Sequence, residues 1–180
     1  MVDDSRGQLA SLLHHYSVIQ HHIYSGQFHS AWRQYRLFSS EFRSVELPVI
    51  RASLYEAGAL IAAHRASESE KTKWTKESIA LCEKLSETGL PHAMAASLLI
   101  KGLVMRSKDQ DQARESLEQA KQLARDAMWK PIHLAAVDAI YSLDPGEWTG
   151  RLREAMRRDG VEEPERFERL YTVPLGEREF

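Results

Sequence analysis

The chain has 180 residues, of which 43% are hydrophobic and 28% are charged, and its formal net charge is −2. This composition is typical of a globular protein and excludes a disordered or fibrous chain. The near-balance of acidic and basic residues argues against a dedicated nucleic-acid-binding protein, which usually carries a basic excess. The single cysteine, Cys82, excludes an internal disulfide and a zinc site built from several cysteines.

The two ends and the apolar stretches give no sign of a membrane or secretory segment. The first six residues are acidic and polar, and they lack the basic start and apolar core of a signal peptide. The longest apolar stretch, 93–105, is too short to cross a bilayer as a helix. We therefore expect a cytoplasmic protein with no membrane partner.

Helix signals follow one another along the whole chain, and strand signals are almost absent. Gly26 separates two amphipathic segments, and Gly89 followed by Pro91 is typical of a helix stop and a new start. Ser67 with Glu70, and Asp109 with Gln112, have the spacing of a helix-capping box. Together these signals predict helices at 7–24, 27–43, 48–64, 69–88, 91–106, 109–128, 131–143 and 146–158, and a short ninth helix from Pro164 to Tyr171.

The helix pairs recur at a spacing of about 40 residues, which is typical of helical repeat proteins. The stretches 78–85 and 116–123 also match each other, and each places a small residue, Cys82 or Ala120, three positions before a leucine. We therefore predict an all-α fold, a right-handed array of antiparallel helix hairpins with eight or nine helices in one domain, 1–180. The predicted pairs are 7–43, 48–88, 91–128 and 131–158, followed by a C-terminal cap and tail at 159–180.

The pattern within these pairs resembles the tetratricopeptide-repeat family. That pattern alternates small and large apolar residues at fixed positions of each helix pair. Three parts of the chain match it: 26–38, the stretch Leu54-Tyr55-Glu56-Ala57-Gly58, and the positions Gly102, Ala113, Leu117 and Ala120. The resemblance covers roughly residues 7–143. It implies an α-solenoid in which the first helix of each pair lines a concave groove.

If the resemblance holds, six side chains point into that groove: Arg51, Tyr55, Ala59, Leu99, Leu103 and Arg106. Tyr55 beside Arg51 has the composition of a binding hot spot, although a scattered surface tyrosine is commoner. The helix at 91–106 is apolar nearly all round, which favours burial between its neighbours over a role in lining a groove.

Histidines are concentrated near the start of the chain, and His15, His22 and His29 recur every seven residues. Seven residues of helix span about 10.5 Å, too far for two imidazoles to share one metal ion. We therefore expect no metal site, and we regard these three histidines as a secondary surface that faces solvent or a partner.

No catalytic or cofactor motif is present: the sequence has neither a Gly-x-Ser-x-Gly elbow nor a Gly-rich phosphate loop. We expect a non-catalytic module without a cofactor that binds a protein or peptide in the groove, as a scaffold or a regulatory region. The alternatives are a chaperone that holds an apolar client segment, and, in another class, an RNA-binding helical repeat or a small-ligand sensor.

The weakly charged first hairpin is compatible with a homodimer. Near the other end of the chain, the apolar stripe of Trp148, Leu152 and Met156 predicts a helix that caps the array.

Overall fold

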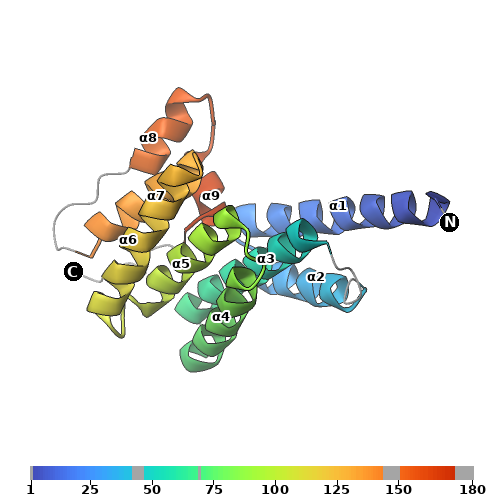
Figure 1. Cartoon of the computed structure of the whole chain (residues 1–180), viewed down its shortest axis with the longest axis horizontal. Helices are drawn as coiled ribbons and strands as arrows, with labels where there is room; N and C mark the ends of the chain where they lie inside the picture. The colour runs from blue at the N-terminus through green and yellow to red at the C-terminus, as the bar shows by residue number, and fades with distance from the viewer. Residues whose placement is uncertain (1, 42–46, 69, 144–150, 173–180) are drawn as a thin grey trace.

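The computed structural model describes residues 2–41, 47–68, 70–143 and 151–172, and within these ranges the chain forms helices and no strand. The elements in chain order are α1 (Val2–Tyr24), α2 (Phe28–Glu41), α3 (Pro48–Glu68), α4 (Lys71–Ser86), α5 (Pro91–Met105), α6 (Gln110–Asp126), α7 (Lys130–Tyr141), α8 (Arg151–Arg158) and α9 (Pro164–Phe167), then the 3-10 turn η1 (Glu168–Leu170) (Figure 1). The predicted all-α fold is confirmed.

Most of the predicted helix ends are confirmed, and the local chemistry explains them. Gly26 and Gly89 adopt the left-handed backbone conformation that ends a helix, with φ of 73° and 70°. The Asp109 side chain accepts a hydrogen bond from the Gln112 amide at 2.9 Å and so caps α6. The predicted short ninth helix is present as α9, although its last turn tightens into η1.

Two predicted helix starts are wrong. The first helix begins at Val2 rather than at residue 7. The capping box at Ser67 placed a helix boundary there, but Ser67 lies inside α3, which continues to Glu68. The boundary falls at Glu70, whose left-handed backbone (φ 46°) precedes α4 and whose side chain makes no capping bond. The spacing was correct for a capping box, but alanines at 62, 63 and 66 carry the helix past it, because alanine has the highest helix propensity.

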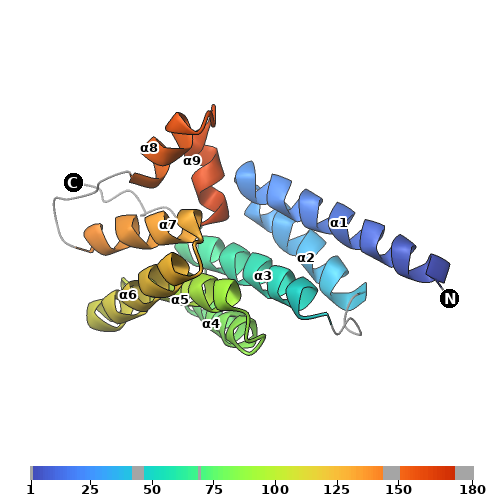
Figure 2. The same cartoon turned by 45° about the horizontal axis from the view of Figure 1, so that its top comes forward.

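The helices pack as consecutive antiparallel hairpins in two layers (Figures 1 and 2). The odd-numbered helices α1, α3, α5 and α7 contact one another in sequence and form one layer. The helices α2, α4 and α6 each contact the helix before and the helix after them, and form the other layer. We call the exposed side of the odd-numbered layer, away from α2, α4 and α6, the inner face.

Glycines allow the closest helix crossings. A Cβ atom added at Gly102 on α5 would lie 2.6 Å from Cγ of Leu117 on α6. One added at Gly58 on α3 would lie 2.5 Å from the ring of Tyr35 on α2. Cys82 and Ala120, the small residues of the two matching stretches, are also fully buried. Small residues therefore set the spacing of the hairpins.

The last long helix, α8, covers the end of the array. Leu152 and Met156 are buried, whereas Arg157 and Arg158 face solvent, as expected for a cap; Trp148 lies outside the described residues. The buried Asp138 of α7 accepts a hydrogen bond from the Leu152 amide at 2.8 Å and fixes the start of α8. Among the described residues, no helix is long and apolar enough to cross a membrane.

Candidate functional site

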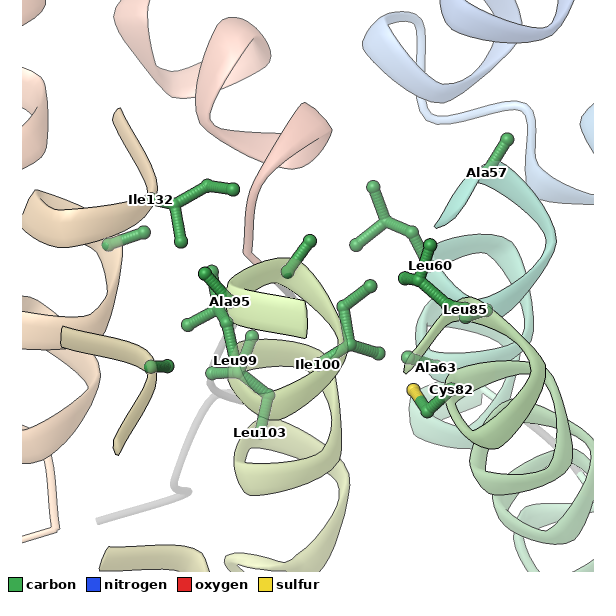
Figure 3. Close-up of a cluster of buried hydrophobic side chains, with 14 of the residues drawn as sticks. Ala57, Leu60, Ala63, Cys82, Leu85, Ala95, Leu99, Ile100, Leu103 and Ile132 are labelled. Atoms are coloured by element: carbon green, nitrogen blue, oxygen red, sulfur yellow. The ribbon is translucent and has the colours of Figure 1, made fainter. Parts of the chain in front are cut away.

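The chain's own C-terminal segment, residues 163–172, lies against the inner face. This segment comprises α9, η1, and the residues that flank them, and η1 contacts α1. Leu170 and Tyr171 share a small cavity with residues of α3, α5 and α7, among them Leu60, Leu99 and Ile132. Figure 3 shows Leu60 and Ile132 on either side of α5, below the pale red ribbon of the C-terminal part of the chain. The inner face therefore holds a peptide segment.

Three residues of α3 form the stripe that receives this segment: Glu56, Leu60 and His64. They are spaced four residues apart, so they lie on one side of the helix. His64 Nε2 donates a hydrogen bond to the carbonyl oxygen of Arg169 at 3.0 Å. Glu56 and Leu60 border the cavity that Leu170 and Tyr171 close. The α3 stripe thus meets both the backbone and the side chains of the segment.

His64 is a buried, uncharged hydrogen-bond donor. Its side chain is 1% exposed, and its ring stacks on the ring of Phe28 with centroids 4.1 Å apart. Burial disfavours the charged imidazolium and lowers the pKa of His64 to about 4, against the opposing effect of its bonds to backbone carbonyls. At neutral pH the ring is therefore neutral, and it presents one N–H to the segment.

Glu56 is the acidic group of the inner face. Its cavity is lined otherwise by apolar side chains and by Tyr171, and burial raises the pKa of Glu56 to about 7. Burial and the charge of Glu56 also raise the pKa of Tyr16 and of Tyr171, which face it. The cavity measures about 10 Å³, which is the space of one water molecule at most. It leaves no room for a small-molecule ligand.

Polar contacts with α1 and α8 hold the rest of the segment. The Arg169 guanidinium donates to the Tyr24 carbonyl at 2.9 Å, and the Tyr24 hydroxyl donates to Glu163 at 2.8 Å. Arg153 of α8 forms an ion pair with Glu168. Tyr24 is the last residue of α1, so the Arg169 cation lies at the negative end of that helix.

Much of the predicted groove is wrong. Ala59, Leu99 and Leu103 are buried, with 0%, 1% and 5% exposed, and cannot line an open groove. The predicted stripe of α3, at Arg51, Tyr55 and Ala59, lies one residue, and therefore about 100°, away from the stripe that contacts the C-terminal segment. Of the six predicted residues, Leu99 borders the inner-face cavity, beneath the segment. The favoured burial of the helix at 91–106 is confirmed.

The other predicted groove residues lie elsewhere on the surface. Arg51 is exposed, and its guanidinium lies over the ring of the half-buried Tyr55 at 5.9 Å from the ring centroid. Arg106 is half-buried at the end of α5. Sequence reasoning missed Glu56 and His64, although both are ionisable residues in the mostly apolar α3, and that contrast was a usable signal.

The three histidines of the secondary surface do not form one surface. His15 is half-buried between α1 and α2, where Gln34 Nε2 donates to its Nδ1 at 2.6 Å. His22 Nδ1 donates to Gln27 at 2.9 Å, and His29 is exposed. Within the described ranges, no group of three or more histidine, cysteine or acidic side chains is placed to hold a metal ion.

Cys82 is buried, and burial raises the pKa of its thiol to about 12, so the thiol stays protonated at neutral pH.

A second exposed surface lies on α2. His29, Arg33, Arg36 and Leu37 border an open hollow of about 480 Å³, together with Trp32 and Ser40. Leu37 is 53% exposed, and Leu13 in the middle of α1 and Leu47 and Val49 at the start of α3 are exposed as well. Residues 5–40 contain no acidic residue. We call the side chains around this hollow the first-hairpin surface; it is apolar and basic.

Comparison with protein-family models, with curated proteins and with solved structures finds no match to this chain. The resemblance to tetratricopeptide repeats therefore stays a prediction.

Proposed function

We propose that this protein is a non-catalytic interaction module that binds a segment of another protein on its inner face. The carrying observation is that a short peptide segment, the chain's own residues 163–172, already lies there. His64 bonds to a backbone carbonyl, which every peptide has, while apolar side chains receive Leu170 and Tyr171. Backbone bonds supply affinity and side-chain contacts supply specificity in peptide recognition.

The competing functions find less support on this face. The chaperone alternative relied on the apolar helix at 91–106, whose large residues Leu99 and Leu103 are buried. A small-ligand sensor needs a pocket far larger than the cavity of about 10 Å³ beside Glu56. RNA binding needs cations along the recognition face, whereas the α3 stripe offers an acid and a neutral imidazole.

A matched pair of charge reversals tests the proposal. Glu56→Lys changes the inner face, and Arg36→Glu changes the first-hairpin surface. We expect affinity capture with the wild-type chain to recover a protein that Glu56→Lys loses and Arg36→Glu retains, with helix content of both variants checked by circular dichroism. A partner that both variants retain would contradict the proposal, as would recovery of nucleic acid alone.

The first-hairpin surface is a second candidate, favoured by the exposed Leu37 and Leu13. Exposed apolar residues on one hairpin are what a homodimer through that hairpin would bury. If it self-associates, the weight-average mass in sedimentation experiments rises with concentration for the wild type and stays at 20.6 kDa for Leu37→Glu. Loss of a captured partner in Arg36→Glu alone would assign partner binding to this surface instead.

A further inference from the structure

The contact between the C-terminal segment and the inner face differs from the contacts between hairpins. The segment has only the four-residue α9 and the three-residue η1, too short to form long helix-to-helix contacts. Its anchors are individual side chains and hydrogen bonds: His64 to the Arg169 carbonyl, Arg169 to the Tyr24 carbonyl, and Tyr24 to Glu163.

The fit beneath the segment is also incomplete. Leu170 and Tyr171 are only half-buried, and a cavity remains between Tyr171, Glu56 and Leu99. The Glu56 carboxylate is desolvated there when the segment is in place. In contrast, hairpin contacts such as the one at Gly102 and Leu117 leave no space for a single added carbon. The segment thus leaves a void of about 10 Å³ against the face, and its two large side chains there are less covered than the core residues of the hairpins.

We propose that residues 163–172 are an autoinhibitory occupant of the inner face: the segment opens as a unit, and a partner segment with the same chemistry replaces it. The opening is a property of this chain, and the replacement rests on the proposed function. Regions of low local stability open while the rest of a protein stays folded, and the contacts described above make this segment such a region.

The contacts define the chemistry of the competing partner. An arginine reaches the carbonyl end of α1, where the helix dipole favours a cation. Its own backbone carbonyl accepts the His64 bond. An aliphatic residue and then a tyrosine follow and lie on the floor formed by Leu60, Ala96 and Ile132. The expected partner therefore carries an arginine-aliphatic-tyrosine sequence, as the chain does at 169–171.

The test uses the 180-residue chain and a fluorescent peptide with the sequence of residues 162–172. Leu170→Glu removes an apolar anchor and should free the inner face in the chain. We expect this variant to bind the peptide at least about 100-fold more tightly than the wild type, because a tethered segment competes at millimolar effective concentration. A control peptide that carries the same Leu170→Glu change should not bind. Equal binding to both chains, or binding to neither, would overturn the proposal.

A milder variant covers the case in which Leu170→Glu fails to fold. Arg169→Ala removes only the guanidinium bond to the Tyr24 carbonyl and keeps both apolar anchors. It should raise peptide affinity by roughly 10-fold relative to the wild type, in line with the loss of one charge-assisted bond. If both variants lose their helix content, the segment is an obligatory part of the fold and the proposal is wrong.

This experiment separates the two proposals. Peptide binding to Leu170→Glu without any captured protein partner would support the autoinhibitory segment and contradict the proposed function. Capture that depends on Glu56, with no peptide binding to either variant, would support the proposed function and overturn the autoinhibitory segment.

Discussion

Helix α3 has two faces that pack in different ways. Towards α4 it presents Ala59, Ala62 and Ala66, all buried, and the Ala59 carbonyl accepts a buried hydrogen bond from Ser78 at 2.9 Å. Towards the C-terminal segment it presents Glu56, Leu60 and His64, of which two are titratable. Small apolar residues let helices pack closely at any pH. Desolvated titratable groups, in contrast, make the stability of a contact depend on pH.

Helix α3 therefore both packs permanently against α4 and holds the C-terminal segment. The side of α3 that packs against α4 has no titratable group among Ala59, Ala62 and Ala66, so its packing does not depend on protonation. The segment side is held by groups whose charge costs free energy when the segment covers them. We expect substitutions on the two sides to differ in the size and in the pH dependence of their effect on stability.

Leu85→Ala should have the largest effect on stability, because it removes buried side-chain atoms from the packing between the hairpins. Leu85 is fully buried on α4, near Cys82 (Figure 3). Truncation of a buried leucine to alanine lowers the free energy of unfolding by about 3 kcal/mol. Urea denaturation followed by circular dichroism measures this loss. A loss below about 1 kcal/mol would mean that the hairpin core is less tightly packed than the structure indicates.

Glu56→Gln should stabilise the protein at alkaline pH, because it removes a carboxylate that burial penalises. The pKa of Glu56 is raised to about 7 in the folded chain from an ordinary value of 4.5. Stability is therefore highest below pH 4.5 as far as this group is concerned, and it falls as pH rises to 7. The facing groups are the hydroxyls of Tyr16 and Tyr171, which are neutral throughout this range. This shift corresponds to about 3 kcal/mol. Because the Glu56 side chain keeps some contact with solvent, we expect a smaller gain of about 2 kcal/mol at pH 8, and none at pH 4.

His64 contributes a pH dependence of the opposite sign. Its pKa is lowered to about 4, so its contribution to stability is present above pH 6.5 and is lost as pH falls towards 4. The nearby charge is that of Arg169, which also disfavours the imidazolium. Urea denaturation of Glu56→Gln between pH 4 and 8 should therefore show stability that rises with pH, whereas the two groups partly cancel in the wild type. The same pH dependence in both chains would contradict the burial of Glu56.

Gly102→Ala tests the close crossing of α5 and α6. The added carbon would lie 2.6 Å from Cγ of Leu117 and 3.1 Å from the carbonyl oxygen of Ala113. Alanine gains about 1 kcal/mol in helix propensity, and overpacking costs about 1–3 kcal/mol, so we expect a net loss of about 1 kcal/mol. In a Leu117→Ala background the added methyl finds space, so the same substitution should become stabilising. Thermal denaturation of the four chains of this double-mutant cycle measures the coupling.

Arg157→Ala should have the smallest effect, although it removes an ion pair with Glu165 of the C-terminal segment. Both partners are exposed, at 60% and 50% of their side chains. Exposed pairs contribute about 0–1 kcal/mol, so the unfolding free energy should stay within about 0.5 kcal/mol of the wild type in urea denaturation. A larger loss would show that the segment is held mainly by its outer ion pairs rather than by the inner face.

The sequence predicted the hairpins well because their signals are local. Gly26, Gly89 and the Asp109 cap lie at helix ends in the structure as predicted, since a left-handed residue or a capping side chain acts within one turn. The missed boundary at Ser67 also has a local cause, because helix-favouring alanines surround a correctly spaced capping box.

The α3 stripe of Glu56, Leu60 and His64 could not be predicted in the same way, because it depends on which side of α3 the distant residues 163–172 cover. A helix that is apolar on several sides, such as α3, does not reveal which side faces which neighbour. The resemblance to known repeats suggested the side with Arg51 and Tyr55, one residue away from the real stripe. The ionisable Glu56 and His64 mark an unusual side of the mostly apolar α3, but nothing near them in the sequence indicates that they contact residues more than 100 positions later, as His64 contacts Arg169.

Native-state amide hydrogen exchange on the unmodified chain tests the central claim most directly. The amides of Tyr171 and Thr172 both donate to the Glu168 carbonyl at 2.9 Å. These bonds belong to a single helical turn, which is unstable in water once it leaves the inner face, so their exchange reports the opening of the segment. If the segment opens separately, they exchange at least about 100-fold faster than the amides of Leu60 in α3 and Leu99 in α5, and with little dependence on denaturant. Exchange at the same rate as the core, with the denaturant dependence of global unfolding, would contradict the claim.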